Sequence, residues 1–167
     1  MRGVTLVELV IAMLVVAILA SVVALSYQSN DVRARYQAER LRTDLRHAQM
    51  LATTLNRPLL FAITAGLGGS YSVSRLDNAT CAASPLTDPA TNDPFAVTLD
   101  SAVTLAGTAS IYLDYMGRPA TACAAVSATC TCTTASADPA ASYTVAGGSA
   151  GYTVQVKPVS GFVTLTP

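Results

Sequence analysis

The sequence predicts an α+β fold in which one long N-terminal helix packs against an antiparallel β-sheet domain. Three observations predict it. An apolar run occupies the N-terminus as far as Leu25, a helical stripe of apolar residues begins at Ala34, and an alternating, strand-like pattern replaces it after Pro58. The chain has 167 residues, which is enough for one domain with a modest core.

The first predicted element is an apolar helix. Residues Leu9–Leu25 contain one polar residue, Ser21, and no proline, and about 17–25 such residues cross a hydrocarbon core. Glu8 is the exception, because a charge at mid-bilayer costs on the order of 3 kcal/mol and usually marks function. Two alternatives remain: a plain anchor with Glu8 near the interface, and a secretory signal with Arg2 as its charged region and cleavage within Val22–Ser26.

The second half of the helix is predicted to be amphipathic. The polar stretch Ser26–Asp31 predicts a bend or fraying, and Asn56–Arg57–Pro58 ends the helix because a residue before proline avoids helical dihedrals. The stripe that faces the sheet recurs at spacings of three and four and comprises Ala34, Ala38, Leu41, Leu45, Ala48, Ala52 and Leu55. The opposite face is basic, with Arg33, Arg35, Arg40, Arg42, Arg46 and Arg57.

The remainder is predicted to be β-rich. A final hairpin is the clearest, with strands Tyr152–Lys157 and Phe162–Leu165 joined by the turn Pro158–Gly161. We predict loops over Asp77–Pro94 and over Ala120–Ala141, a low-complexity surface segment that disulfides hold. Further strands are predicted at Leu59–Thr64, Tyr71–Leu76, Phe95–Leu99, around Val103, and at Ile111–Tyr115, after which Met116–Pro119 is predicted to turn the chain.

Four cysteines, Cys81, Cys123, Cys130 and Cys132, all follow the helix. An even number in an exported domain indicates disulfides. A bridge across one residue would be strained, so one of Cys130 and Cys132 is expected to join Cys123 and the other Cys81. Incomplete pairing would leave free thiols. The spacing lacks a Cys-x-x-Cys pair, and we predict no metal site and no cofactor.

The sequence contains no catalytic constellation, and we predict that the protein is not an enzyme. His47 is the only histidine and is predicted to be a solvated helix residue with no nucleophile beside it. Asp88, Asp93 and Asp100 lie near one another in the sequence, but their spacing fits no calcium loop.

The arginine-rich helix face can be interpreted in two ways. Arginines on one face can contact phosphates, which makes them candidate polyanion contacts. Alternatively they lie against anionic headgroups or pair with Asp31, Glu39 and Asp44. The net charge of the chain is zero, so any attraction for polyanions is local. The candidates are Arg33, Arg35, Arg40, Arg42 and Arg46.

The segment Gly3–Leu9, GVTLVEL, with the apolar run behind it, resembles the processing site of type IV pilins and type II secretion pseudopilins. The resemblance implies cleavage by prepilin peptidase between Gly3 and Val4, methylation of the new N-terminus, and a role in assembly for Glu8, which occupies the fifth mature position. In that family the glutamate pairs with the N-terminal amine of a neighbouring subunit. The sequence departs from the family at Val4, where phenylalanine or methionine is usual.

Two further stretches resemble the GspH/FimT group of minor pilins and pseudopilins, including the mannose-sensitive haemagglutinin minor pilins: Ala38–Phe61 and Tyr112–Pro119. The resemblance implies a minor structural subunit of a type IV pilus or type II secretion pseudopilus, with a major pilin as an alternative. It also implies a division into a leader peptide (1–3), a transmembrane or filament-core helix (4–28), an amphipathic helix half (29–57) and a β-rich extracytoplasmic domain (58–167).

The expected partners are other pilin or pseudopilin subunits, prepilin peptidase, the inner-membrane assembly platform and the membrane. The expected location is the bacterial inner membrane, crossed once with a periplasmic domain, and then the pilus or pseudopilus. An alternative function is a binding module at a pilus tip, whose ligand is DNA or a surface molecule.

Overall fold

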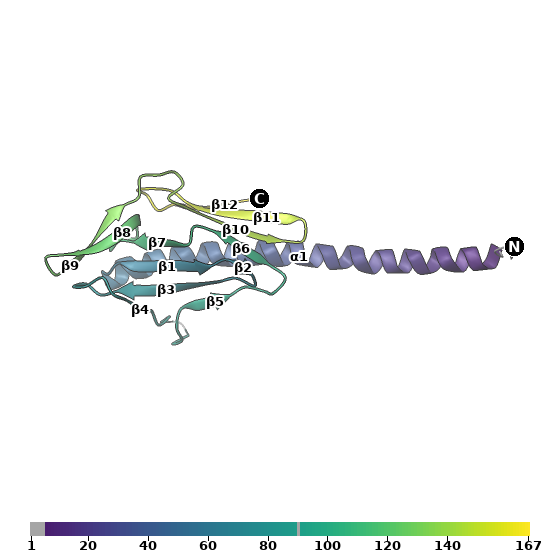
Figure 1. Cartoon of the computed structure of the whole chain (residues 1–167), viewed down its shortest axis with the longest axis horizontal. Coiled ribbons are helices and arrows are strands. Elements are labelled where there is room, and N and C mark those ends of the chain that lie inside the picture. Colours follow the sequence, from purple (N-terminus) through teal and green to yellow (C-terminus); the bar gives the residue numbers. More distant parts are fainter. Residues whose placement is uncertain (1–5, 90) are drawn as a thin grey trace.

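The computed structural model describes residues 6–89 and 91–167, and for residues 22–29 only the backbone. These residues form one helix, α1 (Leu6–Leu55), and two antiparallel sheets (Figure 1). The predicted α+β class, with a long N-terminal helix on antiparallel strands, is confirmed. The predicted processing residues Gly3 and Val4 lie outside the described residues.

Helix α1 is continuous, and its N-terminal part projects alone beyond the sheets (Figure 1). Its 50 residues span about 75 Å at 1.5 Å per residue. The backbone stays helical through 26–31, so the predicted bend or fraying there is wrong. That stretch is polar but contains neither proline nor glycine, the residues at which helices usually kink. Among the described side chains, no helical segment has both the length and the apolarity needed to cross a membrane.

The C-terminal end of α1 is a Schellman motif. The Arg57 N–H donates to the Ala52 carbonyl at 3.2 Å, and the Asn56 N–H donates to the Thr53 carbonyl at 3.3 Å. Asn56 adopts the left-handed conformation, with φ 49°, that this cap requires. The predicted end of the helix before Pro58 is therefore confirmed, and asparagine contributes to it as much as proline does.

The predicted helix stripe is buried except at its end. Ala34, Ala38, Leu41, Leu45, Ala48 and Ala52 have no exposed surface. Leu55 was expected to continue the stripe but is 42% exposed, because it is the last residue of α1 and the chain turns away there. The alanines let the backbone of the sheets approach the helix closely, and α1 packs on β10, β11, β12 and β1.

The strands form two sheets, whereas a single sheet was expected. The first has the order β4-β3-β1-β7-β8-β9, with β5 also paired to β3, and the second has the order β12-β11-β10-β6-β2. The strands are β1 (Leu59–Thr64), β2 (Gly66–Leu67), β3 (Ser70–Leu76), β4 (Ala83–Pro85), β5 (Ala96–Thr98), β6 (Thr104–Gly107), β7 (Ser110–Leu113), β8 (Pro119–Val126), β9 (Thr129–Thr134), β10 (Ala141–Gly147), β11 (Ala150–Val156) and β12 (Val163–Thr166).

The two sheets share one core with the helix stripe. The ring of Phe61 on β1 lies 5.5 Å from that of Tyr71 on β3 and 5.8 Å from that of Tyr143 on β10, between ring centroids. Phe61 therefore joins the first sheet to the second. Tyr71 also reaches the helix, because its hydroxyl donates to the Asp44 carboxylate at 2.5 Å. Burial, together with Asp44, raises the pKa of Tyr71 well above its usual value.

Two predicted loops contain strands. The 77–94 segment includes β4 and a bridge between Thr87 and Pro94, and the 120–141 segment is largely the hairpin of β8 and β9. Alanine, threonine and cysteine dominate β8 and β9 and give little contrast between polar and apolar positions, so strand alternation does not appear there. The other predicted strands, including the β11–β12 hairpin, are confirmed.

The predicted disulfides are present, and Cys130 pairs with Cys81 while Cys132 pairs with Cys123. The second bridge joins directly opposed residues of β8 and β9. The first ties this hairpin to the turn after β3. Each cysteine of the Cys-x-Cys pair thus bonds to a different segment, as the geometric argument required.

Two polar clamps hold the domain to α1 where the helix enters it. The Asp31 carboxylate accepts the N–H groups of Ser149 at 2.8 Å and Ala150 at 3.1 Å, and the Ser149 hydroxyl at 3.0 Å. These bonds lower the pKa of Asp31. Arg33 pairs with Asp100, in the loop before β6, at 3.3 Å. The packed part of the helix therefore begins near residue 30.

Candidate functional site

The N-terminal part of α1 is an exposed apolar surface, which we call the arm and define as residues 6–21. Every side chain of the arm is exposed. Its large apolar side chains are between 50 and 80% exposed: Leu6, Val7, Leu9, Val10, Ile11, Met13, Leu14, Val15, Val16, Ile18 and Leu19. Contiguous apolar surface of this extent marks a membrane or protein interaction site.

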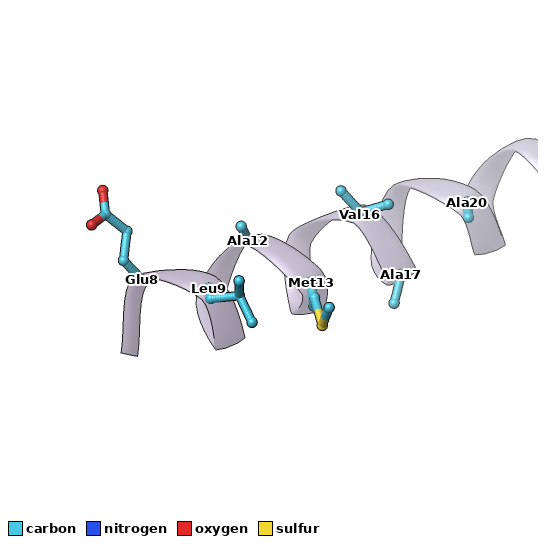
Figure 2. A pocket seen from close by; sticks show the side chains of 7 residues that line it. All are labelled: Glu8, Leu9, Ala12, Met13, Val16, Ala17 and Ala20. Atoms are coloured by element: carbon cyan, nitrogen blue, oxygen red, sulfur yellow. The ribbon is translucent and has the colours of Figure 1, made fainter. Parts of the chain in front are cut away.

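Glu8 lies in the first turns of the arm, at one end of a shallow apolar groove. The groove has a volume of about 530 Å³, and Figure 2 shows the Glu8 carboxylate projecting away from the helix at the end of the row. Ala12 and Ala20 leave space between bulkier neighbours. The rest of the lining is Leu9, Met13, Val16 and Ala17.

This arrangement suits helix packing in an apolar environment. A partner helix would bury the exposed side chains and would enclose the Glu8 carboxylate in a medium of low dielectric constant. A carboxylate there costs several kcal/mol unless a positive charge lies close to it. The arm is therefore a candidate surface for packing against another apolar helix.

The predicted polyanion contacts are mostly engaged within the chain. Arg33 pairs with Asp100, Arg40 with Asp44 at 3.8 Å, and Arg42 with Glu39 at 3.2 Å. The alternative prediction of pairing on the helix surface is thus confirmed for Glu39 and Asp44. Asp31 instead binds the β10–β11 turn.

Arg46 and Arg35 complete this group. The Arg46 guanidinium donates to the Val163 carbonyl at 2.8 Å and lies over the Phe162 ring, 5.8 Å from its centroid. It therefore covers part of the exposed edge of β12. Arg35 is exposed on the helix.

The other predicted positions form no chemical site among the described residues. His47 is half-buried, with its ring centroid 5.6 Å from that of Phe95, so the histidine that was expected to be solvated is only partly exposed. The described residues contain no cluster of three side chains of the types that bind metals. Asp100, one of the three aspartates considered for calcium, holds Arg33 instead.

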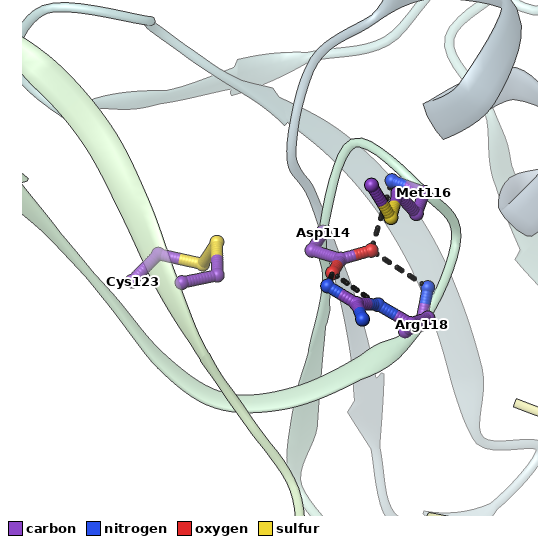
Figure 3. Close-up of polar contacts among 5 residues, drawn as sticks. Asp114, Met116, Arg118 and Cys123 are labelled. Carbon is purple, nitrogen blue, oxygen red and sulfur yellow. Dashed lines mark hydrogen bonds and ion pairs between the residues drawn. A yellow bond between two sulfur atoms is a disulfide. The ribbon is translucent and has the colours of Figure 1, made fainter. Parts of the chain in front are cut away.

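The turn predicted over Met116–Pro119 is present, and it is built on Asp114, whose role was not predicted. This carboxylate is 4% exposed and accepts the N–H groups of Met116 at 2.9 Å and Arg118 at 2.8 Å (Figure 3). The Arg118 side chain closes the turn with an ion pair of 2.7 Å. Gly117, with φ +74°, packs so closely on α1 that a Cβ there would lie 2.8 Å from the Gln49 carbonyl. Aspartate three residues before glycine is a turn pattern that the sequence contains.

No protein-family model matches this sequence, and no curated protein matches it. The chain is similar to a solved structure, that of the minor pseudopilin EpsH from the type 2 secretion system of Vibrio cholerae. It superposes with a TM-score of 0.57 and 10% sequence identity, over 80% of this chain and 96% of that chain. At this identity the likeness establishes a shared fold, in which a long N-terminal helix packs on antiparallel sheets.

Proposed function

We propose that this protein is a structural, non-enzymatic subunit of a type II secretion pseudopilus or a related type IV pilus, and that it joins its neighbours through the arm. The observation that carries the proposal is the arm itself. One helix exposes apolar side chains and a single carboxylate, Glu8, at one end and holds a folded domain at the other. The fold shared with a minor pseudopilin supports it.

Assembly would depend on a charge pair between subunits. Cleavage between Gly3 and Val4 by prepilin peptidase, followed by methylation, would create an N-terminal amine at Val4. An incoming subunit's Glu8 would pair with that amine on its neighbour, and each charge would offset the cost of burying the other. The GVTLVEL segment supports this assignment of Gly3, Val4 and Glu8.

Before assembly, the precursor would cross the bacterial inner membrane once. The apolar sequence Leu9–Leu25 extends past the described side chains and supports this location. Arg2 would stay on the cytoplasmic side and the sheets would lie in the periplasm, an oxidising compartment in which disulfides form. The subunit would be a minor one, and its partners would be the peptidase, the assembly platform and other pseudopilins.

Replacement of Glu8 tests the proposal. In cells that carry the whole assembly system, Glu8→Ala should be processed and recovered in the membrane fraction, but at least about tenfold depleted from sheared filaments. Ser21→Ala, which removes a neutral polar group from the same arm, should assemble normally. Normal amounts of Glu8→Ala in filaments would overturn the role of Glu8. Mass spectrometry of the native product should find a chain that begins at Val4, and an intact Met1 or a start near Leu25 would overturn the processing.

The alternative of a DNA-binding tip module has less support, because Arg33, Arg40, Arg42 and Arg46 contact groups of the chain itself. A gel-shift assay with a fragment from Ser29 to Pro167 separates the two functions. We expect no retardation of duplex DNA at physiological salt. Retardation that weakens as salt rises would favour the DNA-binding function.

A further inference from the structure

A second concave surface lies at the opposite end of the molecule from the arm, and we call it the distal cleft. It has a volume of about 380 Å³, within the roughly 300–1,000 Å³ typical of small-molecule sites. The end of α1, the turn after β3, the turn after β7 and the β8–β9 hairpin meet there, and Figure 1 shows this end farthest from the N-terminus.

The cleft has an apolar floor and a neutral polar rim. Pro58 and Cys130 are buried and form the floor. The exposed side chains around them are two amides, a phenol, a hydroxyl and the methyl group of Ala128. None of the residues that line the cleft carries a charge. The rim residues are Asn56, Asn78, Tyr115, Ala128 and Thr129.

Each wall of the cleft is fixed by hydrogen bonds within the chain. The Schellman motif fixes the backbone conformation of Asn56, and the buried Asp114 holds the turn that carries Tyr115. The Asp77 carboxylate accepts two backbone N–H groups, at 2.9 and 3.0 Å, and so shapes the turn that carries Asn78. The Asn78 carbonyl in turn accepts the Cys130 N–H. The cleft is therefore preformed, which lowers the entropic cost of binding.

Unusual backbone conformations gather around this cleft. Among the described residues, six non-glycine residues have positive φ. Of these, Asn56 lines the cleft, Cys81 is bonded to Cys130 in its lining, and the adjacent Ser127 and Ala128 contribute Ala128 to the lining. Ser127 and Ala128 form the two-residue turn of the β8–β9 hairpin, a position that usually takes asparagine and glycine. Such conformations persist only where the surrounding structure enforces them, and they cluster at binding and active sites.

We propose that the distal cleft binds a neutral saccharide. The Tyr115 ring, 49% exposed, offers an apolar face to the C–H groups of a sugar ring. The amides of Asn56 and Asn78 and the hydroxyl of Thr129 supply neutral donors and acceptors for sugar hydroxyls. The absence of charge in the lining disfavours phosphates and acidic peptides. This proposal does not depend on assembly through the arm.

A glycan array with the full-length chain tests it, followed by saturation-transfer NMR on the best-retained glycan. The chain is kept in a zwitterionic detergent, because alkyl glycosides would compete for the cleft. We expect retention of at least one neutral glycan by the wild-type chain. Tyr115→Ala and Asn78→Ala should each weaken that binding by about tenfold or more, whereas Tyr115→Phe, which keeps the ring, should stay within about threefold.

Tyr36→Ala is the matched control, because Tyr36 is an exposed tyrosine on α1 near the other end of the domain, 65% exposed, and its removal should leave binding unchanged. Disulfide mapping and circular dichroism verify that each variant folds. The proposal is overturned if the wild-type chain retains no neutral glycan. It is equally overturned if Tyr115→Ala binds as the wild type does, since the glycan would then lie elsewhere.

Discussion

At the residue scale, Asp114 is the side chain whose burial depends most on its polar partners. Its carboxylate is almost fully buried, yet two backbone N–H groups and the Arg118 guanidinium satisfy it. We expect Asp114→Ala to lower the free energy of unfolding by about 3 kcal/mol, because it removes a charge-assisted network and leaves Arg118 unpaired. Urea denaturation measures the change.

The control for this variant is Asp138→Ala. Asp138 also forms an ion pair, with Lys157 at 2.9 Å, but both side chains are well exposed. Its removal should cost no more than about 0.5 kcal/mol. Equal losses for the two variants would contradict the special role of burial at Asp114.

Tyr71 makes the free energy of unfolding depend on pH in the alkaline range. Its pKa is raised in the folded state, first by burial and then by Asp44. The stabilisation is therefore present below the unfolded pKa of about 10 and is lost as pH rises above it, at about 1.4 kcal/mol per pH unit. In Tyr71→Phe, the free energy of unfolding should fall less steeply with pH above pH 10, by about 1.4 kcal/mol per pH unit. Urea denaturation at pH 8, 10 and 11 measures this slope. If the free energy of unfolding changes equally with pH in the wild type and in Tyr71→Phe, Tyr71 does not titrate on unfolding.

At the scale of elements, the two disulfides should contribute unequally. Cys81–Cys130 closes a separation of 49 residues and Cys123–Cys132 one of 9, so the loop-entropy estimate is about 4 kcal/mol for the first and about 2.6 kcal/mol for the second. We expect the Cys81→Ala/Cys130→Ala double variant to lose more stability than Cys123→Ala/Cys132→Ala. The reverse order in guanidinium denaturation would contradict the loop-entropy argument.

The helix and the strands differ in how clearly the sequence predicts them. The helix stripe was predictable because Leu41 and Leu45 stand among arginines and acidic residues, so that the helical period has strong contrast. Strand β10 was missed although Tyr143 and Val145 alternate with smaller or polar residues, because it follows a low-complexity stretch that we assigned to a loop. In β8 and β9 the alternation itself is absent, since both faces of that hairpin are largely exposed.

At the scale of the whole molecule, the arm and the domain should be separable. Contacts between α1 and the sheets begin near residue 30, where Gly147 approaches the Asn30 carbonyl. We therefore expect a fragment from Ser29 to Pro167 to be monomeric and to unfold with a free energy within about 1 kcal/mol of the full chain. Its Ser29, Asn30 and Asp31 are all good helix-capping residues. Failure to form both disulfides would contradict this separation.

The two candidate sites also differ in predictability. Glu8 was identifiable because its anomaly is local: one charge in an apolar run can be recognised without any tertiary contact. The distal cleft draws Asn56, Asn78, Tyr115 and Thr129 from four segments, and only the folded chain brings them together. No spacing in the sequence predicts that these four residues meet, because each segment taken alone has the pattern of an ordinary turn or helix end.

The continuity of α1 has a mechanical consequence. The strands beside it run roughly along its axis (Figure 1), and its buried stripe extends from Ala34 to Ala52. Tension on the arm along that axis would load the whole stripe in shear, so that many contacts must yield at once, instead of peeling away one after another. A helix packed in this way can transmit a lengthwise pull to the domain without unravelling.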